Sequence, residues 1–318
     1  MLSGKKVLVT GATGQIARPI AERLATDNEV WAAARFLRYT DARTEAHSDV
    51  RAEMEAQGIR TVPWDLSTGD NSMLPDDFTH VLHAAFLIGA EDHNTAVQVN
   101  GECTALLMQH CRKAEAFVFV SGVVVYKPLE PDHLHKETDP LGGVATYSPD
   151  YPSGKIAGEV AARTAARMLN LPTTIARMNI GYGMFGHGGM PVLCYQLMRA
   201  GQPIPVPIGH ENYGSPIHQD DIAEQGSGPL FEIASVPATI VNWAGNDVVT
   251  QREYCDYIGS FTGLTPQYVE SDEGLVFEAY ASDTTLRDSL IGRCKVGWKE
   301  GIRQVIEAQF PEDFQATA

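Results

Sequence analysis

Residues 5–35 read KKVLVTGATGQIARPIAERLATDNEVWAAAR, an order of apolar run, glycine-rich turn, amphipathic segment and second apolar run. The first run, VLVT, has strand-forming character and no charge, and it leads directly into the turn GATGQIA. Ile16, Ile20 and Leu24 then recur at spacing four, the period of an amphipathic helix. With the second apolar run, VWAAA, the stretch predicts a βαβ unit of about 30 residues.

The glycine-rich turn predicts a binding site for a dinucleotide. Gly11 allows the tight turn, Gly14 lets the backbone approach a pyrophosphate, and the small Ala17 lets the helix pack closely on the strand. The amino end of the helix offers unpaired N–H groups and a partial positive charge to the phosphates. The alternative is a turn that only joins two elements, but the strand and helix on either side favour nucleotide binding. The turn residues expected at the cofactor are Gly11, Thr13, Gly14, Gln15 and Ile16.

The second strand indicates which dinucleotide binds. A site for NAD usually has an Asp or Glu about 20 residues after the turn, where it accepts a hydrogen bond from the ribose 2′-hydroxyl. Residues 30–40 contain no acid. Ala34 removes repulsion of a 2′-phosphate, and Arg35, helped by Arg38 or Arg18, supplies a planar donor group that suits it. We therefore expect NADP in preference to NAD; the alternative is an ordinary surface arginine at a strand end.

The composition limits which kinds of partner the protein is expected to bind and in which cell compartment it is expected to occur. The chain of 318 residues has a formal charge of −16 and lacks the clustered Lys and Arg that nucleic acid or an anionic membrane requires. Its apolar runs are much shorter than the about 18 residues of a membrane span, and its first strand begins too early for a signal peptide. Five scattered cysteines without a C-x-x-C pair suit reduced thiols. We expect a cytoplasmic protein whose partner is a small molecule.

Two histidines in a polar loop, His133 and His135, raise the question of a metal. Imidazoles are ligands of zinc and related ions, but this pair lies in a loop, where no helix sets a third ligand beside it. We therefore expect no metal site.

Strands and helices alternate along the first half of the chain. Further strands are predicted at residues 59–63, 78–85 and 117–120, with helices at residues 41–58 and 95–113. Five strands that alternate with helices predict an α/β fold with an open, mostly parallel, doubly wound sheet of the Rossmann type.

Residues at the ends of these strands match a dinucleotide site. Asp65, just after the third strand, lies at the rim where adenine binds and could accept a hydrogen bond from its amino group; it could equally cap the segment that follows. Ala84 and Ala85, at the end of the fourth strand, leave space for a cofactor to pass.

Tyr151 and Lys155 form a chemical pair. At spacing four they share one face of a helix, and an ammonium group near a phenol should lower the tyrosine pKa from its usual value of about 10. Such a tyrosine can act as an acid or base toward a carbonyl or alcohol oxygen. The pattern Tyr-x-x-x-Lys is a common accident by itself, but after the fifth strand of a nucleotide-binding sheet it indicates a catalytic pair.

These motifs together resemble the extended short-chain dehydrogenase/reductases, the superfamily that includes nucleotide-sugar epimerases and dehydratases. The resemblance covers nearly the whole chain: residues 10–17 are similar to the TGxxGxxG/A fingerprint, residues 177–183 to the RxxNxYG segment and residues 217–223 to the IHVDDVA stretch. It implies that Tyr151 and Lys155 are catalytic, with Lys155 also bonded to the nicotinamide ribose.

The resemblance also implies further cofactor contacts and an assembly. In this superfamily the helices that correspond to residues 95–113 and 151–169 form a dimer bundle, so a homodimer is expected. The additional cofactor contacts that the resemblance implies are Asp65, Leu66, Ala84, Ala85 and Asn100.

One departure from the superfamily concerns the catalytic hydroxyl. A Ser or Thr four residues before the tyrosine of the SSxxVY segment usually helps to polarise the substrate oxygen, and this chain has Gly122 there. Ser121 could take the role if the loop were displaced; otherwise it satisfies backbone groups and no hydroxyl assists. A missing donor near a developing oxyanion costs about 10²-fold to 10³-fold in rate. The candidate catalytic group is therefore Tyr151, Lys155 and Ser121, with the role of Ser121 open.

A second departure concerns the substrate. Nucleotide-sugar members commonly carry an Arg shortly before the IHVDD stretch to hold the diphosphate, but residues 210–216 contain none. With the weakly charged, glycine- and proline-rich segments 186–191 and 203–207, this predicts a pocket for a small, weakly charged molecule. Asn179 could touch this substrate or serve only as a structural turn residue. The candidate substrate contacts are Val123, Asn179, Tyr182 and Met190.

The predicted architecture has two interleaved domains. Residues 1–178 with about 217–244 form the Rossmann domain, and about 179–216 with 245–318 form a smaller, C-terminal substrate domain. The function expected first is an oxidoreductase that transfers a hydride between NADP(H) and a carbonyl or alcohol carbon. The alternative is a sugar epimerase or dehydratase that retains its cofactor, and a third hypothesis is an NADPH-binding regulatory protein without catalysis.

Overall fold

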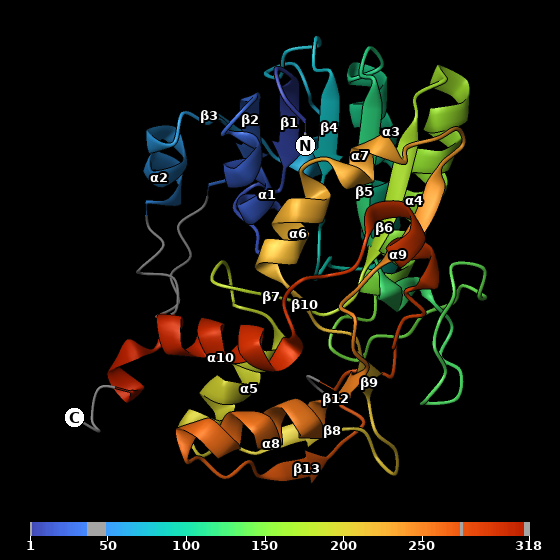
Figure 1. The fold of residues 1–318 in the computed structure, drawn as a ribbon. Coiled ribbons are helices and arrows are strands. Elements are labelled where there is room, and N and C mark those ends of the chain that lie inside the picture. Colours follow the sequence, from blue (N-terminus) through green and yellow to red (C-terminus); the bar gives the residue numbers. More distant parts are fainter. Residues whose placement is uncertain (1, 37–48, 274–275, 315–318) are drawn as a thin grey trace.

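A parallel seven-stranded sheet forms the upper half of the molecule in the view of Figure 1. The computed structural model describes residues 2–36, 49–273 and 276–314. The strand order is β11-β6-β5-β4-β1-β2-β3, and every neighbouring pair is parallel. The bounds are β1 (Lys6–Thr10), β2 (Glu29–Ala34), β3 (Arg60–Pro63), β4 (His80–His83), β5 (Ala116–Gly122), β6 (Thr173–Met178) and β11 (Thr239–Trp243).

This sheet confirms the predicted Rossmann-type fold and adds the strand β6, which the sequence analysis did not predict. Its sequence, TTIARM, contains two threonines and an arginine, so it lacks the apolar run of a buried strand. All six residues are nevertheless buried between β5 and β11. The guanidinium of Arg177 is accommodated because the carboxylate of Glu159 is buried beside it.

Helices cover both faces of the sheet, as a parallel sheet requires. One face packs against α1 (Ala17–Leu24), α6 (Gln219–Gly226) and α7 (Pro229–Glu232), and the other against α3 (His93–His110) and α4 (Tyr151–Leu169). The short helix α2 (Val50–Ala56) adds Met54 to the first of these cores, whereas residues 41–48 of the predicted helix lie outside the described residues. The alternating residues of β1 divide between the two cores, since Val7 and Val9 face one and Leu8 the other.

A smaller part lies below the carboxyl ends of the strands (Figure 1). It has its own core, which includes Tyr182, Tyr195, Tyr254 and Ile302. The precise limits of the two predicted domains stay a prediction. The elements of the lower part and its connections are β7 (Gly181–Tyr182), α5 (Met190–Arg199), β8 (Ile204–Val206), β9 (Tyr213–Gly214), β10 (Ile217–His218), β12 (Val249–Thr250), α8 (Gln251–Thr262), β13 (Tyr268–Glu270), α9 (Thr285–Ile291) and α10 (Trp298–Gln309).

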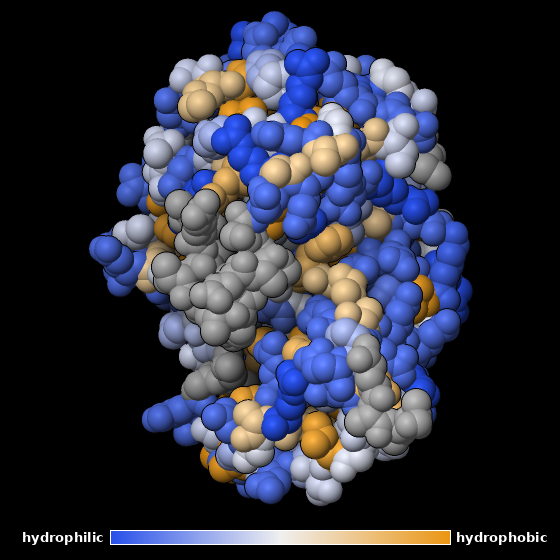
Figure 2. All heavy atoms as spheres, turned by 90° about the vertical axis from the view of Figure 1, so that its left-hand side faces the viewer, coloured by the Kyte–Doolittle hydropathy of each residue, from blue (hydrophilic) through white to orange (hydrophobic). Residues whose placement is uncertain are grey.

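The surface is mainly hydrophilic, as expected when the apolar residues are packed between the layers. In the view of Figure 2 hydrophilic residues cover most of the described surface, and the apolar residues form small groups between them. Among the described residues, no helix is both long and apolar enough to cross a membrane.

Candidate functional site

A cavity of about 1700 Å³ lies at the carboxyl ends of the strands, between the sheet and the smaller lower part. In open α/β sheets, ligands bind at this edge because the chain reverses its winding direction there. The ends of β1, β2, β4 and β5 line the upper wall, and α5 and the end of α10 line the lower wall. We call this space the cavity below.

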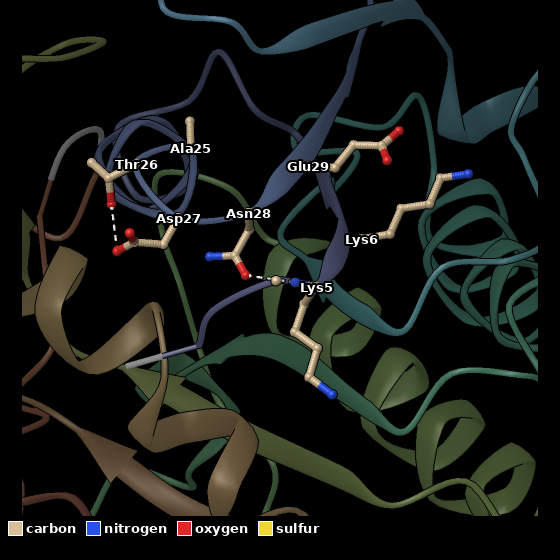
Figure 3. A pocket seen from close by; sticks show the side chains of 8 residues that line it. Lys5, Lys6, Ala25, Thr26, Asp27, Asn28 and Glu29 are labelled. Carbon is tan, nitrogen blue, oxygen red and sulfur yellow. Dashed lines mark hydrogen bonds between the residues drawn. The ribbon is translucent and has the colours of Figure 1, made fainter.

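A second hollow, of about 570 Å³, lies at the opposite end of β1 and β2 (Figure 3). The side chain of Asn28 accepts a hydrogen bond from the backbone N–H of Lys5 there, at 3.0 Å. The ammonium groups of Lys5 and Lys6 are paired elsewhere, with Glu115 and Asp77 respectively. The described residues that line this hollow therefore offer no free cation to a ligand, and the large cavity is the candidate site.

The glycine turn at the top of the cavity has the geometry that the sequence predicts. Gly11 has a φ of +66°, and a Cβ atom there would lie 2.7 Å from the backbone nitrogen of Ala85. The N–H of Gly14 donates to the carbonyl of Gly11 at 2.9 Å, which closes the turn. Ala84 and Ala85 also line the cavity, so the turn and the end of β4 form one surface of small residues and exposed backbone. The turn residues that line the cavity are Gly11, Thr13, Gly14, Gln15, Ile16 and Ala17.

Gln15 links this turn to the lower part of the molecule. Its side-chain amide donates to the carbonyl of Gly181 at 2.6 Å. A Cβ atom at Gly189 would lie 2.9 Å from that same amide nitrogen. The two parts therefore meet closely at the turn, and Gln15 lies at the junction.

The residues predicted at the adenosine end differ in their positions. Ala34 and the exposed Arg35 line the cavity, whereas Arg38 lies outside the described residues. Arg18, the alternative helper, is already bonded to Glu22 at 2.9 Å and to Glu53 at 2.5 Å. Because its guanidinium is occupied, Arg18 is not a free donor for a 2′-phosphate.

Asp65 and Leu66 line the cavity, but the Asp65 carboxylate also caps the segment beyond it. It accepts from the N–H of Ser67 at 2.9 Å and from the Ser67 hydroxyl at 2.8 Å. The capping role is thus observed, and it holds the carboxylate at the cavity rim; the contact with adenine stays a prediction.

The structure does not place Asn100 in the cavity wall, where the predicted cofactor contacts were expected. Its side chain is buried, accepts from the N–H of Leu87 at 2.8 Å and donates to the carbonyls of Leu87 and Ala96. All of these bonds are to backbone, and Asn100 does not line the cavity. Asn100 holds the backbone of Leu87, which does line the cavity.

Tyr151 and Lys155 lie in the cavity wall on the first two turns of α4. The Lys155 ammonium group donates to the carbonyl of Val120 at 2.8 Å and lies 4.1 Å from the centre of the Phe86 ring. Phe86 also contacts Tyr151 edge to face, with ring centres 5.2 Å apart. The pair is thus brought together as predicted, with an aromatic ring packed against both members.

The acid–base properties of this pair differ from the prediction. Burial raises the pKa of Tyr151 to about 12, whereas the sequence predicted that Lys155 would lower it. Burial likewise lowers the pKa of Lys155 to about 7, against the smaller opposing effect of Glu159. A lysine that is partly neutral at pH 7 exerts a weak field on the phenol, so the protein by itself keeps Tyr151 protonated.

Ser121 lines the cavity, but its hydroxyl already has a partner, and its part in the candidate catalytic group stays a prediction. Its hydroxyl donates to the buried carboxylate of Glu159 at 2.6 Å, and Arg177 holds the same carboxylate through two hydrogen bonds. The hydroxyl therefore belongs to a buried polar network. A Cβ atom at Gly122, by contrast, would lie 3.3 Å from the Tyr151 hydroxyl oxygen, so position 122 is the one that faces the tyrosine.

The predicted substrate contacts divide into two groups. Val123 and Met190 line the cavity, and Asn179 lines it while its side chain bonds to backbone and side-chain groups around it. Tyr182 does not line the cavity; it is 1% exposed and lies in the core of the lower part, with its ring against His218. The prediction for Tyr182 is therefore wrong, because the chain turns its ring into that core.

Several residues of the cavity wall were missed by the sequence analysis. Tyr147 lies four residues before Tyr151 and lines the cavity. The centre of its ring is 4.6 Å from that of Phe277 and 6.2 Å from that of Tyr151. Arg199 lines the far end, where Glu312 and Asp313 pair with it. Local patterns could not identify these residues, since Phe277 and the acidic pair come from distant parts of the chain.

Comparison with known proteins places this geometry in context. Residues 7–222 match the model of the NAD dependent epimerase/dehydratase family. One curated protein is similar, the hybrid PKS-NRPS synthetase tasS of Hapsidospora irregularis, with 30% identity over 177 residues, or 55% of this chain. The chain spans about 4% of the length of that relative.

Solved structures share the fold at low sequence identity. UDP-glucuronic acid 4-epimerase from Bacillus cereus, in complex with UDP-glucuronic acid and NAD, has a TM-score of 0.81 and 18% identity, with 96% of this chain and 99% of that chain covered. dTDP-glucose 4,6-dehydratase from Bacillus anthracis, in complex with NAD, has a TM-score of 0.79 and 17% identity, with 97% of each chain covered. MoeE5, in complex with UDP-glucose and NAD, has a TM-score of 0.75 and 22% identity, with 96% and 99% covered.

Proposed function

Because the chain belongs to the NAD dependent epimerase/dehydratase family, we propose that it binds a nicotinamide dinucleotide at the Gly11 turn and uses Tyr151 as an acid/base. Tyr151 would exchange a proton with the oxygen of a carbinol or carbonyl group on a small substrate. The observation that carries this proposal is that the glycine turn and the Tyr151–Lys155 pair line one cavity.

The residues of the cavity fit a dinucleotide. At Gly11 a side chain would collide with the backbone of Ala85, which leaves a groove lined by backbone for the phosphates. When bound, the dinucleotide supplies a carbon that accepts or donates a hydride. Lys155 is placed to hold a hydroxyl group of the ligand by exchanging its bond with Val120, and its positive charge would then favour the phenolate of Tyr151.

We propose that the cofactor is retained through the reaction, as in an epimerase or dehydratase. The family and the solved structures support this choice, since those relatives carry the names of epimerases and dehydratases. Net oxidation or reduction of a weakly charged substrate is the second candidate. It is favoured by Arg199, whose guanidinium is already paired with two carboxylates and is not free to bind a diphosphate.

Cofactor content and turnover distinguish these two chemistries. For a retained cofactor, we expect the purified protein to release a nicotinamide dinucleotide on denaturation and to convert its substrate without added cofactor. A protein that is active only with a stoichiometric supply of NAD(P)H would support the second candidate. Tyr151→Phe should lower kcat by about 10²-fold to 10⁴-fold while dinucleotide binding persists. Equal rates for the variant and the wild type would contradict the role of Tyr151.

The preference for NADP stays a proposal of its own. It is supported by Ala34 and the exposed Arg35 at the cavity, whereas the named solved structures hold NAD. Ala34→Asp would place a carboxylate where a 2′-phosphate would bind and should shift the ratio of dissociation constants toward NAD. Arg35→Ala, which removes only the cation, serves as the comparison. A wild type that binds NAD more tightly than NADP would refute the preference.

Tyr147 is the residue we propose as the hydrogen-bond donor that Gly122 does not provide. It lines the cavity beside Tyr151, and its ring is held against Phe277. Its hydroxyl bonds to no described residue, so it is available to a substrate oxygen. Tyr147→Phe keeps the ring and should lower kcat by about 10-fold to 10²-fold, since an oxyanion donor is lost. An unchanged kcat would exclude this role.

A homodimer through the outer face of α3 and α4 is also a proposal. Both helices expose large apolar side chains there: Leu106 is 49% exposed, Val160 is 58% exposed and Met168 is 80% exposed. Light scattering should then give twice the chain mass of 34.6 kDa. Val160→Glu should dissociate the dimer, whereas Met73→Glu, at an exposed apolar residue elsewhere, should not. A monomeric wild type would exclude the proposal.

A further inference from the structure

Three residues of the loop between β5 and α4 converge on one point. The side chains of His133, His135 and Asp139 place their ligand atoms within 4.8 Å of one another, and we call them the His-His-Asp cluster. Nε2 of His133 lies 2.6 Å from Oδ2 of Asp139, and Nδ1 of His135 lies 3.6 Å from the same oxygen. The cluster is separate from the cavity, because none of the three lines it.

His135 is buried without a satisfied imidazole. Its side chain is 0% exposed, and neither ring nitrogen forms a hydrogen bond of normal geometry to a described residue. The ring faces the Asp139 carboxylate and the backbone of Ala279, and the rings of His133, Tyr126 and Tyr280 pack around it. A buried polar group left unpaired destabilises the folded state, so the ring requires a partner.

The ring cannot leave this environment by a local movement. The backbone N–H of His135 donates to the carbonyl of Ala281 at 2.8 Å, and its own carbonyl accepts from the side chain of Asn242 at 2.7 Å. The ring is stacked on Tyr126, with centres 4.9 Å apart and planes 14° apart. His135 is therefore fixed with a nitrogen directed at a carboxylate oxygen.

In a neutral imidazole, one ring nitrogen accepts hydrogen bonds through its lone pair and cannot donate one. Where that nitrogen faces a carboxylate oxygen, a cation between the two atoms stabilises both. Two imidazoles and one carboxylate are typical ligands of Zn²⁺, whereas Mg²⁺ and Ca²⁺ prefer oxygen ligands alone. A tetrahedral Zn²⁺ with bonds of about 2.0–2.1 Å would hold its ligand atoms about 3.3 Å apart. The observed separations need only small side-chain movements to reach this value.

We propose that His133, His135 and Asp139 form a Zn²⁺ site that stabilises the loop between β5 and α4. His133 is 35% exposed and gives the ion a path from solvent, and water would complete the coordination. Farther along this loop, Tyr147 lines the cavity. The ion would therefore have a structural role at a distance from the reacting groups, and this proposal does not depend on the proposed function.

The test is Zn²⁺ titration of tag-free protein that has been stripped with a chelator, followed by calorimetry and by thermal unfolding. We expect one Zn²⁺ per chain and a higher melting temperature with Zn²⁺ than without it. His133→Ala and Asp139→Asn change partly exposed residues and should each weaken binding by more than the about 10-fold to 100-fold that loss of an outer-shell partner costs. The control is His210→Ala, which removes an exposed imidazole outside the cluster.

The outcomes separate a site from adventitious binding. Loss of both the Zn²⁺ affinity and the thermal shift in the two ligand variants, with both retained in His210→Ala, supports the proposal. Absence of saturable binding to the wild type overturns it, and so does equal binding by the wild type and both ligand variants. Circular dichroism of the metal-free variants establishes that they are folded. The readout is binding and stability, so it stays independent of catalytic activity.

Discussion

At the scale of single residues, positions 121 and 122 show how one step along a strand separates a structural role from a catalytic one. Successive side chains of a strand point to opposite sides. Ser121 donates to Glu159 in the buried layer, whereas a side chain at position 122 would face the Tyr151 hydroxyl. The hydroxyl of the serine that looked like a catalytic substitute is thus bonded to Glu159, although the residue lines the cavity.

Ser121→Ala tests the structural role of this serine. The change leaves the buried Glu159 carboxylate with one hydrogen bond fewer, so the free energy of unfolding should fall by about 1–3 kcal/mol. We expect kcat at a temperature well below the transition to stay within about threefold of the wild type, because a catalytic donor would cost about 10²-fold. Urea unfolding and steady-state kinetics measure the two effects. A large loss of kcat in a stable variant would return Ser121 to the catalytic group.

Gly122→Ser tests whether the tyrosine can use a hydroxyl at this position. The new Cβ would lie 3.3 Å from the Tyr151 oxygen, a close contact that requires a small adjustment. Gly122→Ala introduces the same crowding without a hydroxyl. If the substrate oxygen binds beside Tyr151, the Ser variant should have a kcat at least about 10-fold above that of the Ala variant, as expected for an added donor. Equal kcat values in the two variants would place the substrate oxygen elsewhere.

At the scale of elements, the turn between β1 and α1 depends on contact between backbones. The N–H of Gly11 donates to the carbonyl of Ala33 at 2.9 Å, and a side chain at Gly11 would meet the backbone of Ala84 and Ala85. Three strand ends therefore meet at this glycine. Because backbone atoms cannot rotate away as a side chain can, the element tolerates no Cβ there.

Gly11→Ala should consequently lower the free energy of unfolding by more than the strain of a left-handed alanine alone. Gly4 provides a matched control, because it has the same φ of +66° but nothing within 4 Å of the position that a Cβ atom would take. We expect Gly4→Ala to lower the free energy of unfolding by about 1 kcal/mol, the cost of a left-handed conformation for alanine. Gly11→Ala should lower it by at least about 1 kcal/mol more and should weaken dinucleotide binding. Similar values for the two variants would show that the turn relaxes at little cost.

At the scale of the whole molecule, the fold keeps a lysine in an environment that disfavours its charge. Lys155 is 5% exposed, and burial lowers its pKa from the ordinary value of 10.5 to about 7. Between pH 7 and 10.5 the unfolded chain therefore binds more protons than the folded chain at this residue. Stability contributed by this group rises with pH across that window, and the full penalty applies below pH 7.

Lys155→Met should abolish turnover and raise the stability of the folded protein. Methionine fills a similar volume without a charge, so the free energy of unfolding at neutral pH should rise by about 1–3 kcal/mol while turnover is lost. The stability difference from the wild type should shrink as the pH approaches the ordinary lysine pKa of 10.5. Denaturant unfolding at several pH values checks this. Lys113→Met, at an exposed lysine, should show no such trend. A difference that is constant with pH would mean that Lys155 is not destabilised by burial.

The sequence by itself determined the fold class and the position of the glycine turn and of the Tyr151–Lys155 pair in the candidate site. These features depend on local order: an apolar run, a glycine turn and a helix in succession leave few alternatives for the backbone, and Tyr151 and Lys155 share a helix face by spacing alone. The strand β6 escaped prediction because its arginine is neutralised by Glu159, a residue 18 positions away on another element.

Only the tertiary structure decided the direction and the environment of individual side chains. It bonded the Ser121 hydroxyl to Glu159 and buried the Tyr182 ring in the core of the lower part. It committed Asn100 to backbone groups and brought Phe277 beside Tyr147. It also raised the pKa of Tyr151, against the expectation from its spacing to Lys155. The physical reason is that burial and hydrogen-bond partners are set by residues distant in the chain, whereas a sequence pattern records only neighbours along it.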